Sequence, residues 1–178
     1  MASPPPPSFH LYLAPMVRAS TIPLRLLALS LGATATYSEE IIDRSIGHTE
    51  RVVNDTLGTI DFVKRKQASK KQKKAGVNPD VVVFRTHRDT ERNKLIFQLG
   101  TADPVNAAAA AKHLSRDVDG IDVNMGCPKK FSVTGGMGSA LLKDPARAAS
   151  IITAIKAATT LPGESKLSWG DRPARSAL

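Results

Sequence analysis

Cysteine is almost absent from this chain: its 178 residues include only Cys127. A single thiol excludes an intramolecular disulfide framework and fits a reducing compartment. The longest apolar region, residues 22–35, contains Arg25 and is shorter than the roughly 20 residues that cross a bilayer. The N-terminus has prolines but no basic segment of the kind that opens a signal peptide. We therefore expect a cytoplasmic protein with no membrane segment.

Two further patterns are missing or unevenly distributed. No Gly-x-Gly-x-x-Gly motif follows the first predicted strand, which disfavours a dinucleotide-binding open sheet. We also expect no metal site.

The net charge of +9 is concentrated, because residues 64–74 hold seven of the 25 basic residues and no acidic one. We interpret residues 64–80 as a basic loop insertion, and its lysine run as a contact for RNA phosphates, a nuclear-import signal or a loop without a partner.

Apolar runs and helix signals alternate through the rest of the chain. Thr21 before Pro23, Asp103 before Pro104, and Asp144 before Pro145 are typical of helix starts, and Gly32 of a helix end. The predicted helices are separated by short apolar stretches typical of strands. These lie at 9–14, 33–37, 59–63, 82–85, 95–99 and 120–125, with a last short one at 164–167 and a predicted pairing between 59–63 and 82–85.

This alternation predicts an α/β fold with a parallel sheet and covering helices. An eight-stranded barrel and a doubly wound open sheet both fit the pattern. A complete barrel needs about 250 residues, so a chain of this length with about five strands would form an incomplete one. We expect a Pro-rich tail at 1–8, a partial domain at 9–167 and, at 168–178, a tail that does not continue the strand–helix pattern.

Cys127 is the strongest candidate for chemistry. It follows the strand that ends near Asn124 and Met125, and it stands between Gly126 and Pro128. In a barrel this position is the carboxyl-terminal rim, where catalytic groups gather. A thiol there can donate a proton or, as a thiolate, attack a substrate. The alternative is that Cys127 is a small buried residue that only fills space.

Five motifs occur along the chain, in this order: Ala14-Pro-Met-Val, Thr21-Ile-Pro-Leu-Arg-Leu-Leu-Ala-Leu, Glu39-Glu-Ile-Ile-Asp, Phe97-Gln-Leu-Gly and Asn124-Met-Gly-Cys-Pro-Lys-Lys-Phe-Ser-Val-Thr-Gly-Gly-Met-Gly. Their order and spacing resemble the tRNA-dihydrouridine synthases, above all the eukaryotic branch that modifies position 20 of the D-loop. The resemblance runs from about Leu11 to Lys166 and is interrupted by the lysine-rich insertion. It implies an incomplete, C-terminally truncated (β/α)8 TIM barrel.

The resemblance also implies a reaction. In this family FMN is reduced by NADPH and passes a hydride to C6 of a uridine in tRNA. The cysteine that matches Cys127 then protonates C5 as a general acid. The asparagine that matches Asn124 lies beside the target base, where its amide can hydrogen-bond the uracil edge.

The flavin contacts of the family carry over one residue at a time. Three follow the first predicted strand, one follows the second, one stands near the end of the strand at 95–99 and one lies near the end of the chain. Each also has a plain structural reading, as core residue, satisfied amide, helix-start charge or solvated lysine. The matched residues are Pro15, Met16, Val17, Glu40, Gln98 and Lys166.

We expect this chain to have no counterpart of the later loops that hold the flavin phosphate in this family, or of its helical tRNA-binding domain. We therefore expect weak flavin binding, impaired activity and self-association through exposed sheet edges. The rival interpretation is a fragment without catalysis, which binds RNA through its basic loop or has no function. A second rival is another flavin barrel, such as a dihydroorotate dehydrogenase, but the order of the motifs argues against it.

Overall fold

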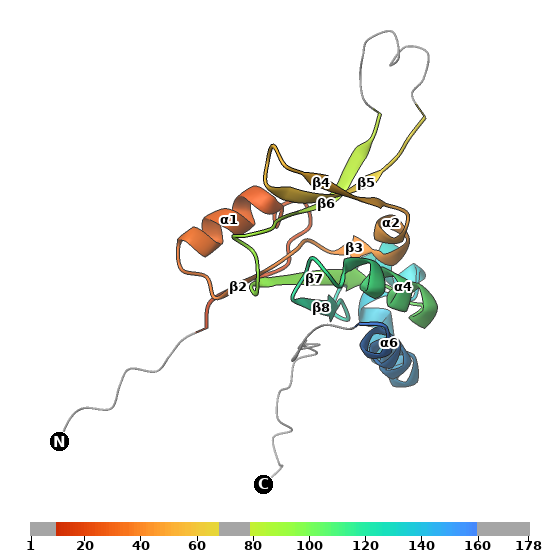
Figure 1. Cartoon of the computed structure of the whole chain (residues 1–178). Coiled ribbons are helices and arrows are strands. Elements are labelled where there is room, and N and C mark those ends of the chain that lie inside the picture. Colours follow the sequence, from red (N-terminus) through yellow and green to blue (C-terminus); the bar gives the residue numbers. More distant parts are fainter. Residues whose placement is uncertain (1–9, 68–78, 160–178) are drawn as a thin grey trace, which may run out of the picture.

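The computed structural model describes residues 10–67 and 79–159, which form two sheets and their covering helices (Figure 1). The larger sheet has five parallel strands, as the α/β pattern predicted. They are β1 (Tyr12–Leu13), β2 (Ala35–Tyr37), β3 (Ile41–Ile42), β7 (Leu95–Gly100) and β8 (Gly120–Val123).

The order of the parallel strands favours a barrel over an open sheet. β1 pairs with β2, β2 with β7, and β7 with β8, so neighbours in the sheet follow one another along the chain. β3 lies beyond β2 along the same edge of β7, where Ile41 pairs with Leu99. A doubly wound sheet reverses its strand order at a switch point, whereas a barrel adds each strand on one side. The predicted partial barrel is therefore confirmed.

The helices begin where local capping signals place them. Asp103 accepts a hydrogen bond from the backbone N–H of Asn106, and Asp144 accepts one from Arg147. Each aspartate thus satisfies an amide that the first helical turn leaves free. The helices are α1 (Ile22–Ser30), α2 (Asp43–Gly47), α4 (Pro104–Leu114), α5 (Lys130–Thr134) and α6 (Pro145–Ala158), with a 3₁₀ helix η1 (Gly138–Lys143) before α6.

A second, antiparallel sheet lies over the helix-covered side of the first (Figure 1). It contains β4 (Glu50–Asn54), β5 (Thr59–Lys64) and β6 (Val81–His87). The predicted pairing of the second and third of these strands is confirmed. β4 was not predicted, because its residues show no apolar run and it depends on pairing with β5.

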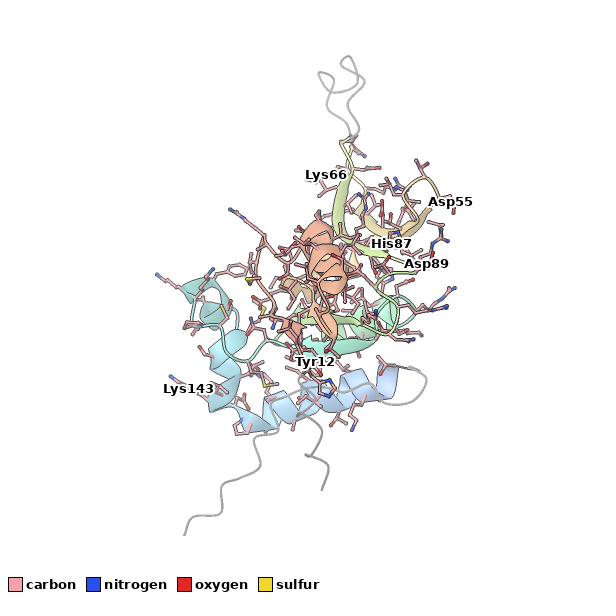
Figure 2. The ribbon with its side chains drawn as sticks, turned by 90° about the vertical axis from the view of Figure 1, so that its left-hand side faces the viewer. Tyr12, Asp55, Lys66, His87, Asp89 and Lys143 are labelled. Carbon is pink, nitrogen blue, oxygen red and sulfur yellow. The ribbon has the colours of Figure 1, made fainter. Side chains whose placement is uncertain are left out.

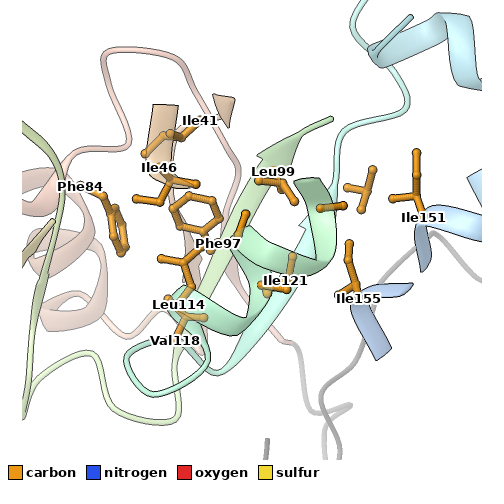
Figure 3. Packing of buried hydrophobic residues seen from close by; sticks show 14 of the residues in the cluster. Ile41, Ile46, Phe84, Phe97, Leu99, Leu114, Val118, Ile121, Ile151 and Ile155 are labelled. Carbon is orange, nitrogen blue, oxygen red and sulfur yellow. The ribbon is translucent and has the colours of Figure 1, made fainter. Parts of the chain in front are cut away.

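The core lies on one face of the parallel sheet. Along β7, Leu95, Phe97 and Leu99 are fully buried, whereas Ile96 and Gln98 between them are half-buried. All three belong to one cluster with residues of α2, α4 and α6, in which Figure 3 shows Phe97 and Leu99. The ring of Phe84 from β6 meets that of Phe97 edge-on, with centroids 4.9 Å apart. The antiparallel sheet is therefore packed against the barrel wall.

A buried ion pair joins α1 to the loop before β7. Arg25 and Glu91 are only 2% and 1% exposed, and Nε of the arginine lies 2.6 Å from Oε1 of the glutamate. The guanidinium also donates to the backbone carbonyls of Ser20 and Arg85. Glu91 accepts further bonds, including one from the backbone N–H of His87. Since both charges are fully hydrogen-bonded, the pair can be kept out of water.

Several predicted segments lie outside the described residues: the tails at 1–8 and 168–178, the strand at 164–167, Lys166, and most of the basic loop. Of that loop, Arg65 is exposed and pairs with Glu50 and Asp80. Lys66 lies far from Lys143 near α6 (Figure 2). Across residues 10–67 and 79–159, no helix is long and apolar enough to span a bilayer.

Candidate functional site

The predicted site residues come together at the carboxyl edge of the parallel strands. The loops after β1, β2 and β8 all leave the sheet there, because parallel strands end at the same edge. The loop after β2 accepts two hydrogen bonds there. The backbone N–H of Arg18, in the loop after β1, donates to Glu39 Oε2 over 2.8 Å, and that of Gln98, in β7, donates to Ser38 Oγ over 2.9 Å. In a (β/α)8 barrel this edge carries the active site.

Cys127 is half-exposed beyond the end of β8 and is not sealed in the core. Its position is fixed by Asn124, whose Oδ1 accepts hydrogen bonds from the backbone N–H groups of Gly126 and Cys127, over 3.0 and 3.2 Å. The hydroxyl of Ser132 in α5 lies 3.4 Å from the sulfur and donates to it. Cys127 is therefore held on a loop fixed by these contacts and is only partly buried.

Gly138 closes this loop against η1. A Cβ at position 138 would lie 2.5 Å from the carbonyl oxygen of Cys127 and 3.1 Å from its Cβ. The backbone there also has a φ of +59°, which side chains disfavour. The same carbonyl accepts a hydrogen bond from the backbone N–H of Ser139 over 3.0 Å. Only glycine lets the two backbones approach this closely.

The amide of Asn124 presents donors. Its oxygen is already bound to two backbone N–H groups of the cysteine loop. An amide has two N–H donors and one oxygen, so what remains for other groups is the NH₂ end. That end hydrogen-bonds the side chain of Glu40. Any substrate contact by Asn124 must therefore be a donation to an acceptor such as a carbonyl oxygen.

Glu40 follows β2 and its carboxylate is partly buried. Burial raises the pKa of Glu40, while the hydrogen bond with Asn124 and the charge of Lys129 act in the opposite direction. Its Oε1 is buried and has no hydrogen-bond partner among the described residues. A Cβ on Gly100 would lie 2.7 Å from that oxygen. The carboxylate thus occupies space that a glycine leaves open, with one acceptor still unmatched.

Gln98 and Asp122 form a pair that the sequence did not reveal. They are register partners on β7 and β8, so their side chains share the face of the sheet opposite the core. Nε2 of Gln98 donates to Oδ2 of Asp122 over 2.8 Å. Burial raises the pKa of Asp122, and the bond from Gln98 lowers it by less. Asp122 alternates with Ile121 and Val123, and this alternation was the available signal.

The loop after β1 presents an apolar surface. Met16 and Val17 are 40% and 53% exposed, and Pro15 is half-buried. Ser20 fixes the loop, because its hydroxyl donates to the carbonyl of Ala14 and accepts from the backbone N–H of Met16, each over 2.9 Å. The loop can therefore offer a stable apolar contact to a flat ring.

This arrangement combines an accessible thiol, two amides and an apolar loop. The thiol can act as a proton donor, the amides can hydrogen-bond a polar ring edge, and the loop can cover a ring face. In the described part of the chain, no cluster of His, Cys, Asp and Glu could hold a metal ion. Lys166 lies outside that part, so its predicted role stays a prediction.

Comparison with known proteins agrees with the motifs. The family model described as dihydrouridine synthase (Dus) matches residues 69–177. The tRNA-dihydrouridine(20) synthase [NAD(P)+] of Saccharomyces cerevisiae is 47% identical over 135 residues, which cover 76% of this chain and 33% of the relative. The protein of the same description from Schizosaccharomyces pombe is 49% identical over 146 residues, covering 80% of this chain and 28% of the relative.

More distant relatives share the same reaction in their names. A probable tRNA-dihydrouridine synthase of Rhizobium leguminosarum is 31% identical over 159 residues, covering 89% of this chain and 41% of the relative. The chain thus spans about a third of the length of the two yeast relatives. The family match, which takes in more than half of the chain, and the geometry of the cysteine loop point the same way: this chain belongs to the dihydrouridine synthase family.

Proposed function

We propose that this chain carries the catalytic acid of a tRNA-dihydrouridine synthase, which reduces the C5–C6 double bond of a uridine in the D-loop, at position 20. One observation carries the proposal: Cys127 is only partly buried beyond the carboxyl end of β8, on a loop held by Asn124. The names of the two yeast relatives support the substrate and the nicotinamide reductant.

The described residues fit the ring of a flavin. Met16 and Val17 offer apolar contact to a ring face, Gln98 offers an amide to its polar edge, and Oε1 of Glu40 is a buried acceptor still without a donor. When bound, FMN reduced by NADPH supplies the hydride that is added to C6. Lys166 completes the proposed set on the resemblance alone, since it lies outside the described residues.

The chain's own residues supply the second hydrogen. As C6 gains a hydride, negative charge develops at C5 and on the neighbouring carbonyl oxygen. Cys127 Sγ gives its proton to C5, which forms the new C–H bond and leaves a thiolate that solvent reprotonates. The amide N–H of Asn124 that does not bond Glu40 can donate to the charged carbonyl oxygen. The product has gained one hydride and one proton, and its C5–C6 double bond is now single.

A deletion strain that lacks its tRNA-dihydrouridine(20) synthase tests the proposal. The strain would carry this chain, or its Cys127→Ala variant, and dihydrouridine in its tRNA would be measured by mass spectrometry. We expect a low but measurable level of the modified base with the natural chain and none with the variant. Equal restoration by both would show that the thiol is not the acid. No restoration by either, with both chains folded, would favour the fragment without catalysis.

A further inference from the structure

Asp122 is a carboxylate on the inner face of the sheet that the proposed reaction does not use. It stands opposite Gln98 in register, and its Oδ2 accepts from Nε2 of that glutamine over 2.8 Å. Keeping an ionised carboxylate partly out of water is costly, and burial accordingly raises the pKa of Asp122. A residue that costs stability in this way is a candidate for a role in the site.

The pair determines which end of the Gln98 amide meets β8. An ionised carboxylate can only accept hydrogen bonds, so the NH₂ end of the amide must face Asp122. The carbonyl Oε1 and the second N–H are then left for another partner. No described residue donates to that Oε1, whereas the oxygen of Asn124 is bound by two backbone N–H groups. The two amides therefore offer different groups: Gln98 a free acceptor beside a donor, and Asn124 donors alone.

We propose that Asp122 is a positioning residue, which fixes the Gln98 amide so that its carbonyl oxygen and second N–H read an imide edge. An imide edge carries an N–H flanked by carbonyl groups. The fixed amide complements it, because Oε1 accepts from the imide N–H while the second amide N–H donates to a flanking carbonyl. A rotated amide would set donor against donor.

Two molecules of the proposed reaction have such an edge: the ring of the flavin and the uracil base. The inference therefore rests on the proposed function. It goes further in naming the atoms that recognise the ligand and the carboxylate that orients them. Gln98 lies within β7, and no described residue donates a hydrogen bond to its free oxygen.

N3-methylated ligands test the inference with the full chain. The isotope-labelled protein would be titrated to millimolar concentration with FMN and 3-methyl-FMN, and separately with uridine and 3-methyluridine, following the side-chain amide of Gln98 by NMR. Methylation removes the imide donor. We expect the natural chain to prefer one unmethylated ligand about tenfold, which corresponds to one hydrogen bond of ordinary strength. The pair that shows the preference identifies the source of the imide.

Two variants separate positioning from a structural role. Asp122→Asn keeps the shape but can donate to Oε1 of Gln98, so that the amide is free to rotate; we expect its preference to fall to about twofold or less. Asp119→Asn is the control, since Asp119 accepts only from backbone N–H groups at the other end of β8; it should keep the tenfold preference.

The inference is overturned if Asp122→Asn prefers the unmethylated ligand as strongly as the natural chain does. It is also overturned if the natural chain prefers neither unmethylated ligand over its methylated form, or binds none of the four ligands. Its failure is distinct from failure of the proposed function. If the natural chain forms dihydrouridine but Asp122→Asn leaves the preference for the unmethylated ligand unchanged, only the inference is overturned. If the natural chain forms no dihydrouridine but shows a ligand preference that Asp122→Asn abolishes, only the proposed reaction is overturned.

Discussion

The two faces of the parallel sheet come from the same strands but differ in burial and in polarity. One face, with Leu95, Phe97 and Ile121, is dry and lies under helices and the antiparallel sheet. The other, with Gln98 and Asp122, is half-buried and bears amides and carboxylates. Since successive residues of a strand point to opposite faces, neighbours can serve stability and chemistry separately. Substitutions on each face should therefore have separable effects.

The largest difference is expected between the neighbours Phe97 and Gln98. Phe97→Ala should lower the free energy of unfolding by about 4 kcal/mol, because it leaves a cavity where the rings of Phe84 and Phe97 meet. Gln98→Ala should change it by less than about 1 kcal/mol. Urea unfolding followed by circular dichroism measures both. Similar losses in the two variants would contradict the division of the sheet into two faces.

Polar residues away from the inner face should behave as scaffold. Glu91→Ala leaves Arg25 buried without its partner and should cost about 3 kcal/mol of stability. Glu39→Ala is a suitable comparison, because that carboxylate holds the loop after β1 through one bond to Arg18 and is partly exposed. Thermal unfolding of the two variants would rank their losses of stability. A Glu91→Ala chain as stable as the Glu39→Ala chain would contradict the role given to the buried pair.

The smallest expected effect is a dependence on pH. Burial raises the pKa values of Glu40 and Asp122 above the ordinary 4.5 and 3.8. Their stabilising contribution is complete below those ordinary values and is lost as pH rises through the raised ones. Asp61 has the opposite sign. Burial raises its pKa, but the hydrogen bonds from Arg85 and neighbouring donors together outweigh burial and lower it, so its contribution is lost as pH falls.

Unfolding measured at a series of pH values separates these signs. The free energy of unfolding of Asp122→Asn, relative to the natural chain, should rise as pH increases from about 4 toward neutrality. That of Asp61→Asn should instead fall as pH increases through the range below about 4, and it should stay level above that range. A flat difference for Asp122→Asn would show that this carboxyl is not disfavoured in its charged form, and the contrast between the two faces would lose its electrostatic part.

Local signals predicted much of the scaffold. Asp103 and Asp144 cap the helices that their sequences indicated, because a cap needs only a side chain and a backbone N–H three residues away. The strand before Cys127 was equally clear, because it is a short apolar stretch. β4 could not be predicted, since what forms it is pairing with β5.

The site was only partly predictable for the same reason. Cys127 and Asn124 lie in one short motif, so their placement followed from the strand end. Asp122 was missed because an aspartate between apolar residues shows its partner only when β7 and β8 are set in register. Glu39 was missed because two adjacent glutamates look alike in sequence, and only the fold shows which one holds Arg18 and which one meets Asn124.

The central claim is that the Cys127 thiol gives its proton to C5 of the uracil. The most direct measurement is the rate of dihydrouridine formation by the purified chain with excess FMN and NADPH, on tRNA that lacks the modified base. Cys127→Ala should slow this rate by about a hundredfold or more without loss of folding. Ser132→Ala, which removes only the hydroxyl beside the sulfur, should retain most of it. An unchanged rate in Cys127→Ala would contradict the account.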